Sequence, residues 1–139
     1  MRIKRFTFIL LVLVFATFMF GCTENKVSRG EAKEQVNLLI DAISNGNFEE
    51  AEKLLHPSEQ VDLEAYFNEA EKEYGVDFQS GIELVKYTNF SSSLYDSEVQ
   101  GGDYELDAII KVGTKRLELT VEVVRNDLGF GIYEIDIDD

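Results

Sequence analysis

The chain has 139 residues, of which 27 are acidic and 13 are basic, so its formal net charge at pH 7 is −14. A surface of this sign repels the phosphate backbone of nucleic acids, and we therefore expect no nucleic-acid partner. The length is sufficient for one hydrophobic core but not for two.

The first 21 residues have the order of a secretory signal. Arg2, Lys4 and Arg5 form a basic start, and residues 6–20 form an uncharged, mainly apolar run of 15 residues. This run is shorter than the roughly 20 residues that a membrane-spanning helix needs. The sequence therefore predicts a cleaved signal peptide at residues 1–21 rather than a permanent anchor. Its removal leaves 10 basic and 27 acidic residues, a net charge of −17.

Cys22 is the only cysteine, and it directly follows Gly21 at the end of the apolar run. A single cysteine cannot form a disulfide within its own chain. These residues resemble the lipobox of bacterial lipoproteins, in which the cysteine receives a diacylglyceryl group and becomes the mature N-terminus. Met19 and Phe20 stand where the family usually has Leu and a small residue, so cleavage elsewhere, or none, is the alternative. The resemblance implies lipidation of Cys22, a tether at residues 22–27 and a location on the outer face of a bacterial cell membrane.

Three helices are predicted after the tether. Ser28 and Glu31 fit a capping box that begins the first helix, whose apolar side chains then recur at helical spacing as far as Ile43. Asn45-Gly46 is typical of a helix end. Asn47 is expected to cap a second helix immediately.

The second predicted helix carries its apolar side chains at Phe48, Ala51, Leu54 and Leu55, and it ends at His56-Pro57. The third runs from about Asp62 to Tyr74 and stops at Gly75. His56 is the only histidine, so no histidine-based metal cluster can form. Its position at a helix end favours a C-terminal cap or a partner of the helix dipole over a catalytic role.

Beyond Gly81 the apolar period changes to two, which predicts an antiparallel meander. The expected strands lie at 82–95, 104–112, 116–123 and 132–138. Gly113-Thr114 is typical of a two-residue type II′ turn, and residues 126–129 form the next turn. The side chains expected on the apolar face of the last three strands are Tyr104, Leu106, Ala108, Ile110, Val112, Leu117, Leu119, Val121, Val123, Tyr133, Ile135 and Ile137. Ile132 is expected on the polar face with Glu134.

Helices followed by an antiparallel sheet predict an α+β domain at residues 28–139, with three helices packed on a curved sheet of four or more strands. The stretch AISNGNFEEAEKLLHP resembles the nuclear transport factor 2-like superfamily within the cystatin-like folds. That resemblance implies a sheet curved into a cone around the first helix. Small bacterial lipoproteins of unknown function commonly carry such domains, and enzymes of the superfamily, such as ketosteroid isomerase and limonene epoxide hydrolase, place Asp and Tyr inside the cone.

The candidate pocket residues are Tyr66, Phe67, Tyr104 and Tyr133, because aromatic side chains on inner faces would line such a cone. Packing in the core with the hydroxyl at the rim is the more ordinary role of these tyrosines. The acidic clusters lack the spacing of a calcium loop, and no phosphate-binding loop or catalytic motif is present. The sequence therefore predicts no metal site and no cofactor.

Three functions remain open from the sequence. The leading hypothesis is a lipid-anchored, non-catalytic module that binds a small apolar molecule in the cone or an envelope protein at the open sheet. The second is a small enzyme that uses a tyrosine or carboxylate inside the cone. The third is a structural spacer or a unit that forms homodimers in the cell envelope.

Overall fold

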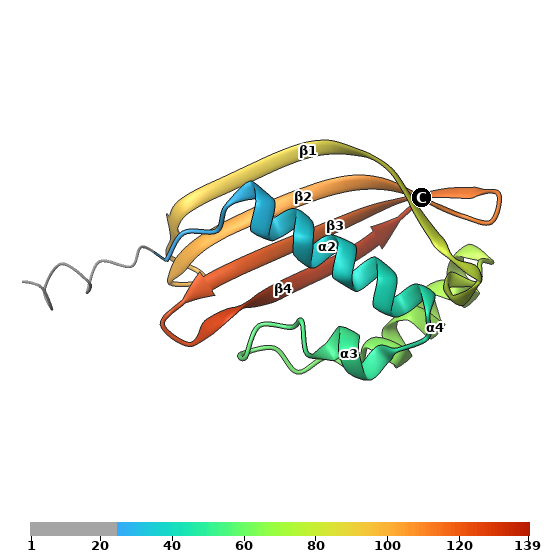
Figure 1. Cartoon of the computed structure of the whole chain (residues 1–139), viewed down its shortest axis with the longest axis horizontal. Coiled ribbons are helices and arrows are strands. Elements are labelled where there is room, and N and C mark those ends of the chain that lie inside the picture. Colours follow the sequence, from blue (N-terminus) through green and yellow to red (C-terminus); the bar gives the residue numbers. More distant parts are fainter. Residues whose placement is uncertain (1–24) are drawn as a thin grey trace, which may run out of the picture.

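The computed structural model describes residues 25–139, so the predicted signal peptide and Cys22 lie outside the described residues. The domain is α+β, with helices packed on an open four-stranded antiparallel sheet in the order β1-β2-β3-β4. Helix α2 (Arg29–Ser44) lies diagonally across one face of the sheet, whereas α3 (Phe48–Glu52) and α4 (Leu63–Tyr74) lie beside the β4 edge (Figure 1). We call the face that α2 covers the inner face and the opposite one the outer face.

Helix α2 begins at the predicted capping box. The Glu31 N–H donates to the Ser28 hydroxyl oxygen at 3.2 Å, and the Ser28 N–H donates to the Glu31 carboxylate at 2.9 Å. Each bond satisfies an N–H group that a helix start would leave without a partner. The buried side chains of α2 are Ala32, Val36, Leu39 and Ile43, which confirms the predicted apolar stripe.

Helix α3 is shorter than predicted, because the chain leaves it at Glu52 to pair with β4. Ile132 donates its N–H to the Leu54 carbonyl at 2.8 Å, and its carbonyl accepts the His56 N–H at 2.7 Å. These bonds replace the helical ones, so the expectation that the helix reaches His56 was wrong. Asn47 stands at the predicted N-cap position, but its side chain makes no capping hydrogen bond.

Helix α4 matches its prediction. The Asp62 carboxylate accepts the Ala65 N–H at 2.9 Å, and Gly75 ends the helix in the left-handed conformation. A short 3₁₀ helix, η1 (Phe78–Ser80), follows and was not predicted. It places the fully buried Phe78 ring 5.2 Å from the Phe67 ring, so it closes the core between α4 and the sheet.

The strands are β1 (Ile82–Asp96), β2 (Gly101–Val112), β3 (Lys115–Asn126) and β4 (Gly129–Asp138). The two-residue turn at Gly113-Thr114 is as predicted, with Val112 opposite Lys115. Three register irregularities interrupt the pairing of β1 with β2. Such irregularities twist an edge strand and make it a poorer template for pairing with another chain.

The inner faces of β2 and β3 carry the predicted apolar residues, all of them buried. In β4 the pattern departs from the prediction, because Glu122 pairs with Glu134 while Val123 pairs with Ile132. Tyr133 is therefore the extra residue of a β-bulge, and Ile132 turns to the inner face, where it is fully buried. The expectation that Ile132 lies on the polar face was wrong.

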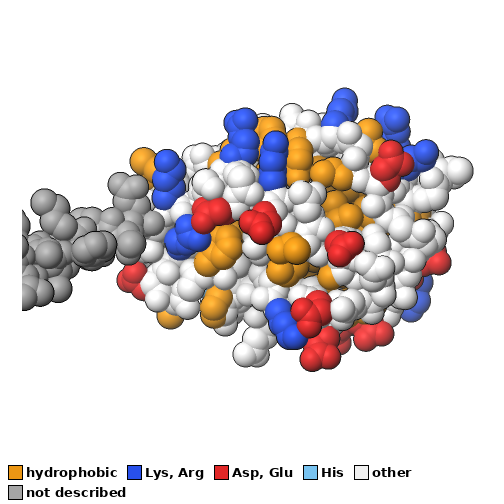
Figure 2. All heavy atoms as spheres, in the orientation of Figure 1, with side chains coloured by type: hydrophobic (Ala, Val, Ile, Leu, Met, Phe, Trp, Pro, Cys, Tyr) orange, Lys and Arg blue, Asp and Glu red, His pale blue; other side chains and the backbone are white. Residues whose placement is uncertain are grey.

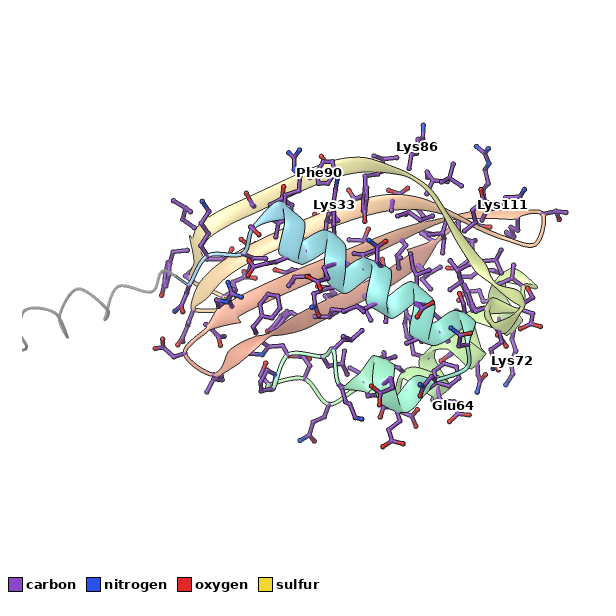
Figure 3. The ribbon with its side chains drawn as sticks, in the orientation of Figure 1. Lys33, Glu64, Lys72, Lys86, Phe90 and Lys111 are labelled. Carbon is purple, nitrogen blue, oxygen red and sulfur yellow. The ribbon has the colours of Figure 1, made fainter. Side chains whose placement is uncertain are left out.

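Two basic side chains of α2 lie against an aromatic ring of β1. Lys33 of α2 lies beside Phe90 of β1 (Figure 3), with the ammonium nitrogen 5.3 Å from the ring centroid. The Arg29 guanidinium lies 4.4 Å from the same centroid. The long side chains thus cover the apolar rim between helix and strand while their charged ends remain near water. Within residues 25–139, no helix is long and apolar enough to cross a membrane.

Candidate functional site

A groove with a volume of about 240 Å³ lies between β4, the start of α4 and the segment at residues 55–61. We call it the β4 groove. Its lining is mostly apolar and consists of Leu55, Val61, Leu63, Tyr66, Tyr133, Glu134 and Ile135. Binding sites in proteins commonly combine apolar walls with a few polar groups, and this groove has that composition.

Hydrogen bonds join the outer edge of β4 to other segments at two points. At one point Ile132 exchanges both backbone hydrogen bonds with Leu54 and His56. At the other, the Tyr74 hydroxyl of α4 donates to the Ile137 carbonyl at 2.8 Å. Backbone groups of alternate strand residues point to the same edge. The N–H and C=O of Ile135, two residues before Ile137, therefore point outward into the groove.

Tyr66 forms one wall of the groove from α4. Burial, together with the negative charge of Asp136, raises the pKa of its hydroxyl to about 12. The phenol therefore keeps its proton at neutral pH, whereas a general base must be able to release its proton near the working pH. Tyr66 can offer a hydrogen bond and an aromatic surface, but it is poorly suited to proton abstraction.

Tyr133 separates the β4 groove from a second, more polar hollow of about 350 Å³. The lining of this hollow is Ser58, Glu98, Val99, Gln100, Asn126, Asp127, Leu128 and Tyr133. The bulge places Tyr133 at this position, with its ring edge-on to the buried His56 ring at a centroid distance of 6.1 Å. The side chain that the sequence places inside a cone thus lies between two surface hollows.

His56 is fully buried, and both ring nitrogens have partners. Its Nδ1 accepts the Ser58 N–H at 3.1 Å, and its Nε2 lies 3.0 Å from the Asn126 side-chain oxygen. The same oxygen accepts the Leu128 N–H, so Nε2 is the donor in its pair with Asn126. His56 therefore joins the 56–58 segment to the β3–β4 turn. It is not the helix cap that the sequence suggested, since α3 ends four residues earlier.

The structure brings together two of the four predicted pocket residues, Tyr66 and Tyr133. Phe67 is 2% exposed and packs in the core, between the rings of Tyr66 and Phe78. Tyr104 is also buried, and its hydroxyl accepts a hydrogen bond from Arg29 at 3.0 Å, at the start of α2. The prediction that Tyr104 lies on the inner face is confirmed, but the residue belongs to the packed core and not to the β4 groove.

A row of three glutamates crosses the outer face of the sheet. Glu105 of β2 lies directly opposite Glu122 of β3, which lies directly opposite Glu134 of β4. Burial, with the charges of Asp103 and Glu134, raises the pKa of Glu122 to about 7. Burial also raises the pKa of Glu105, and Asp107 adds to the effect. Like charges placed opposite each other on a sheet destabilise it, so this row has a free-energy cost.

In the sequence these glutamates are only polar residues that alternate with apolar ones. The Glu105–Glu122 pair was predictable from the sequence, because a two-residue turn at Gly113-Thr114 fixes Val112 opposite Lys115 and therefore Glu105 opposite Glu122. The second pair was not, because the β-bulge shifts the pairing of β4 by one residue. Such a shift has no clear signal in the alternation of residues 129–138.

Among the described residues, no group of three or more His, Cys, Asp or Glu side chains is arranged to hold a metal ion. Some carboxylates of the outer face have protein partners: Asp107, for example, accepts a hydrogen bond from the Thr120 hydroxyl at 2.8 Å.

No protein-family model matches the chain, and no curated protein or solved structure is significantly similar to it. Of the features described above, the β4 groove is the one that places a mostly apolar lining beside the edge of a strand.

Proposed function

We propose that the chain is an exported bacterial lipoprotein, held on the outer face of the membrane by a lipid on Cys22, that binds an apolar side chain of another envelope protein in the β4 groove. It acts as a binding module without catalysis. The proposal is supported by the apolar lining of the groove and by the outward direction of the Ile135 backbone groups, which follows from the edge contacts of Ile132 and Ile137. An extended segment that pairs with a strand edge and inserts one side chain into a pocket is a common mode of recognition.

The size of the groove favours a protein segment over a small molecule. Pockets for drug-sized ligands usually exceed about 300 Å³ and enclose most of the ligand, whereas the β4 groove measures about 240 Å³. The inner face of the sheet gives no support to a ligand inside a cone, because Leu39, Leu106 and Val121 are buried there against one another. A single large apolar side chain with a short stretch of backbone suits the groove better.

We further propose that the domain belongs to the nuclear transport factor 2-like group of cystatin-like folds. The long helix α2 across the inner face of an antiparallel sheet supports this assignment (Figure 1). The shared architecture speaks for a common fold and not for a common activity. The enzyme alternative requires a tyrosine or carboxylate inside the cone, whereas Tyr104 is hydrogen-bonded within the core and Tyr66 and Tyr133 line the β4 groove.

Site-specific photo-crosslinking in the source organism tests the proposed binding. A benzoylphenylalanine at position 61 would place the crosslinker in the β4 groove, where Val61 is 41% exposed. The expected product is one discrete crosslinked envelope protein. It should disappear when Ile135→Lys places a charge in the same groove.

Position 38 supplies the matched control. Leu38 is 44% exposed and lies on α2, in a hollow separate from the β4 groove. The same crosslinker at position 38 should not capture the protein that is captured at position 61. Equal capture at both positions, or no discrete product from position 61, would remove the β4 groove as a binding site.

The lipid anchor has an independent test. The mass of the mature protein should correspond to a chain that begins at Cys22 and carries a diacylglyceryl group. Cys22→Ala should move the protein from the membrane fraction to the soluble fraction. Two acyl chains hold a protein firmly, because each buried CH₂ contributes about 0.8 kcal/mol. An unmodified soluble product from the natural sequence would refute the anchor.

A further inference from the structure

Three large apolar side chains are far more exposed than the rest of their kind in residues 25–139. They are Leu94 at 75%, Tyr95 at 68% and Leu128 at 69%. Leu94 and Tyr95 lie at the end of β1, and Leu128 lies in the turn between β3 and β4. The pairing of Asp96 with Gly101 and of Asn126 with Gly129 places both segments at the same end of the sheet. We call this end the tip.

The tip is also where the tether meets the domain. The Asn25 side chain donates to Asp127 at 3.3 Å, and the Arg125 guanidinium donates to the Lys26 carbonyl at 2.6 Å. Gly102 allows this contact, since a Cβ at that position would lie 1.9 Å from the Asn25 carbonyl oxygen. Figure 1 shows the chain leaving the domain at the end where β1 passes into β2 and β3 into β4. These contacts fix the path of the tether at the tip.

The short distance from the tip to Cys22 limits how the domain can sit on a membrane. Three Cα steps separate Cys22 from Asn25, which span at most about 11 Å. We propose that the tip is a membrane-contact surface and that Leu94, Tyr95 and Leu128 insert into the interfacial region of the lipid layer that holds the anchor. This inference rests on the proposed lipidation of Cys22.

The chemistry of the tip suits a lipid interface. Tyrosine is enriched at membrane–water interfaces, where its ring lies among the headgroups, and leucine gains from the removal of its side chain from water. Asp96, Glu98 and Asp127 also lie at the tip, so the attraction is apolar and not electrostatic. A weak attraction is sufficient, because the anchor keeps the tip at a high effective concentration beside the membrane. The tip then holds the domain upright with the β2–β3 turn away from the lipid.

A single introduced tryptophan can test this orientation, since the chain contains none. Full-length Tyr95→Trp protein, processed in a bacterial host, would be reconstituted into phosphatidylcholine vesicles with and without brominated acyl chains. We expect brominated lipid to quench the fluorescence about twofold, with a blue-shifted emission that does not depend on salt. Adding Leu94→Ser and Leu128→Ser should weaken the quenching, and exposed substitutions of this kind should leave the fold intact.

Thr114→Trp is the matched control, because the 12 residues of β2 separate it from the tip by about 40 Å. It should not be quenched, and equal quenching at both positions would mean that the domain lies flat and would overturn the proposal. A blue shift of Tyr95→Trp that rises with protein concentration, without quenching by lipid, would assign the tip to a second copy of the chain.

Mass spectrometry of the same samples tests the lipid anchor at Cys22 separately from the membrane contact of the tip. Lipid on Cys22 without quenching refutes only the tip, whereas an absent lipid refutes the anchor and the tip together.

Discussion

The two faces of the sheet are built from alternate residues of the same strands, yet they contribute to stability with opposite signs. On the inner face, Leu106 of β2 lies opposite Val121 of β3, and both are essentially inaccessible to water. On the outer face, the neighbouring Glu105 lies opposite Glu122, with Glu134 beyond it. The inner pair gains free energy from the removal of apolar surface from water, and the outer row costs free energy through repulsion.

The hydrophobic stabilisation of this domain therefore comes mainly from the inner side of the sheet. The outer face can tolerate its cost because the inner face is sealed by α2, α4 and η1. On the side shown in Figure 2, Lys and Arg side chains gather along the β1 rim, whereas acidic side chains gather near α3. The like-signed charges of the outer face repel the same face of another copy of the chain.

The largest difference in the free energy of unfolding is expected between substitutions at two adjacent residues of β2, Leu106 and Glu105. Leu106→Ala removes a buried side chain and should lower the free energy of unfolding by about 2–5 kcal/mol, because it leaves a cavity in the inner face. Glu105→Ala, one residue away, should leave the stability unchanged within about 0.5 kcal/mol or raise it, since it relieves repulsion. Urea unfolding followed by circular dichroism measures both. Similar losses for the two variants would contradict the division between the faces.

The next largest effect on stability is expected at Gly131 of β4, beside the bulge that interrupts the alternation of inner-face and outer-face residues. A Cβ on Gly131 would lie 2.6 Å from the His56 backbone nitrogen and 2.7 Å from the Leu55 carbonyl carbon. Gly131→Ala should therefore push residues 55–56 away from Ile132 and lower the free energy of unfolding by about 1–3 kcal/mol.

Gly30→Ala is the control for Gly131→Ala. A Cβ at position 30 would lie 4.0 Å from the Ser28 hydroxyl oxygen, and position 30 is in α2, where alanine is a better helix former than glycine. This variant should be neutral or up to about 1 kcal/mol more stable. Thermal unfolding of the two proteins would show whether the close approach is required, and an unchanged midpoint for Gly131→Ala would argue against it.

A smaller effect should depend on pH. The Glu122 carboxyl has a usual pKa of 4.5, but it holds its proton up to about pH 7 in the folded protein. The folded state therefore binds more protons between these values, so the free energy of unfolding should fall as the pH rises through this range. Glu122→Gln should remove this loss and stabilise the protein at pH 8 by on the order of 1 kcal/mol, a value reduced by solvent screening. At pH 4.5 the variant and the natural protein should be nearly equal, and equal stability at pH 8 would contradict the raised pKa.

The smallest expected effect has the opposite pH dependence, because here the free energy of unfolding should fall as the pH decreases. Hydrogen bonds from Arg125 and from the Ser28 N–H lower the pKa of Glu31 to about 2. Its contribution is present above the usual pKa of 4.5 and is lost as the pH falls from 4.5 towards 2. Glu31→Gln should lower stability at pH 7 by about 0.5–1 kcal/mol, because the ion pair is partly exposed to water. Glu34→Gln, an exposed residue of the same helix, is the control, and equal values for the two variants at pH 7 would contradict the role of Glu31.

Much of the fold was predictable because its signals are local. The capping box at Ser28 and Glu31, the helix stop at Gly75 and the turn at Gly113-Thr114 each depend on a few neighbouring residues. The period-two alternation of β2 and β3 correctly identified their buried faces, because each side chain position in a strand fixes the next. The site was less predictable, since it depends on segments that are far apart in the sequence.

The α+β class, the helix starts and the apolar face of the central strands could all be predicted from local sequence signals, as could the expectation of a lipid anchor at Cys22. The packing of distant segments determines two other features: residues 54–56 leave the helix to pair with Ile132, and a bulge turns Ile132 inward while leaving Tyr133 between two hollows. The physical reason is competition for the backbone hydrogen bonds at the edge of β4. Such bonds form between distant segments, so local propensity cannot reveal which of them prevails.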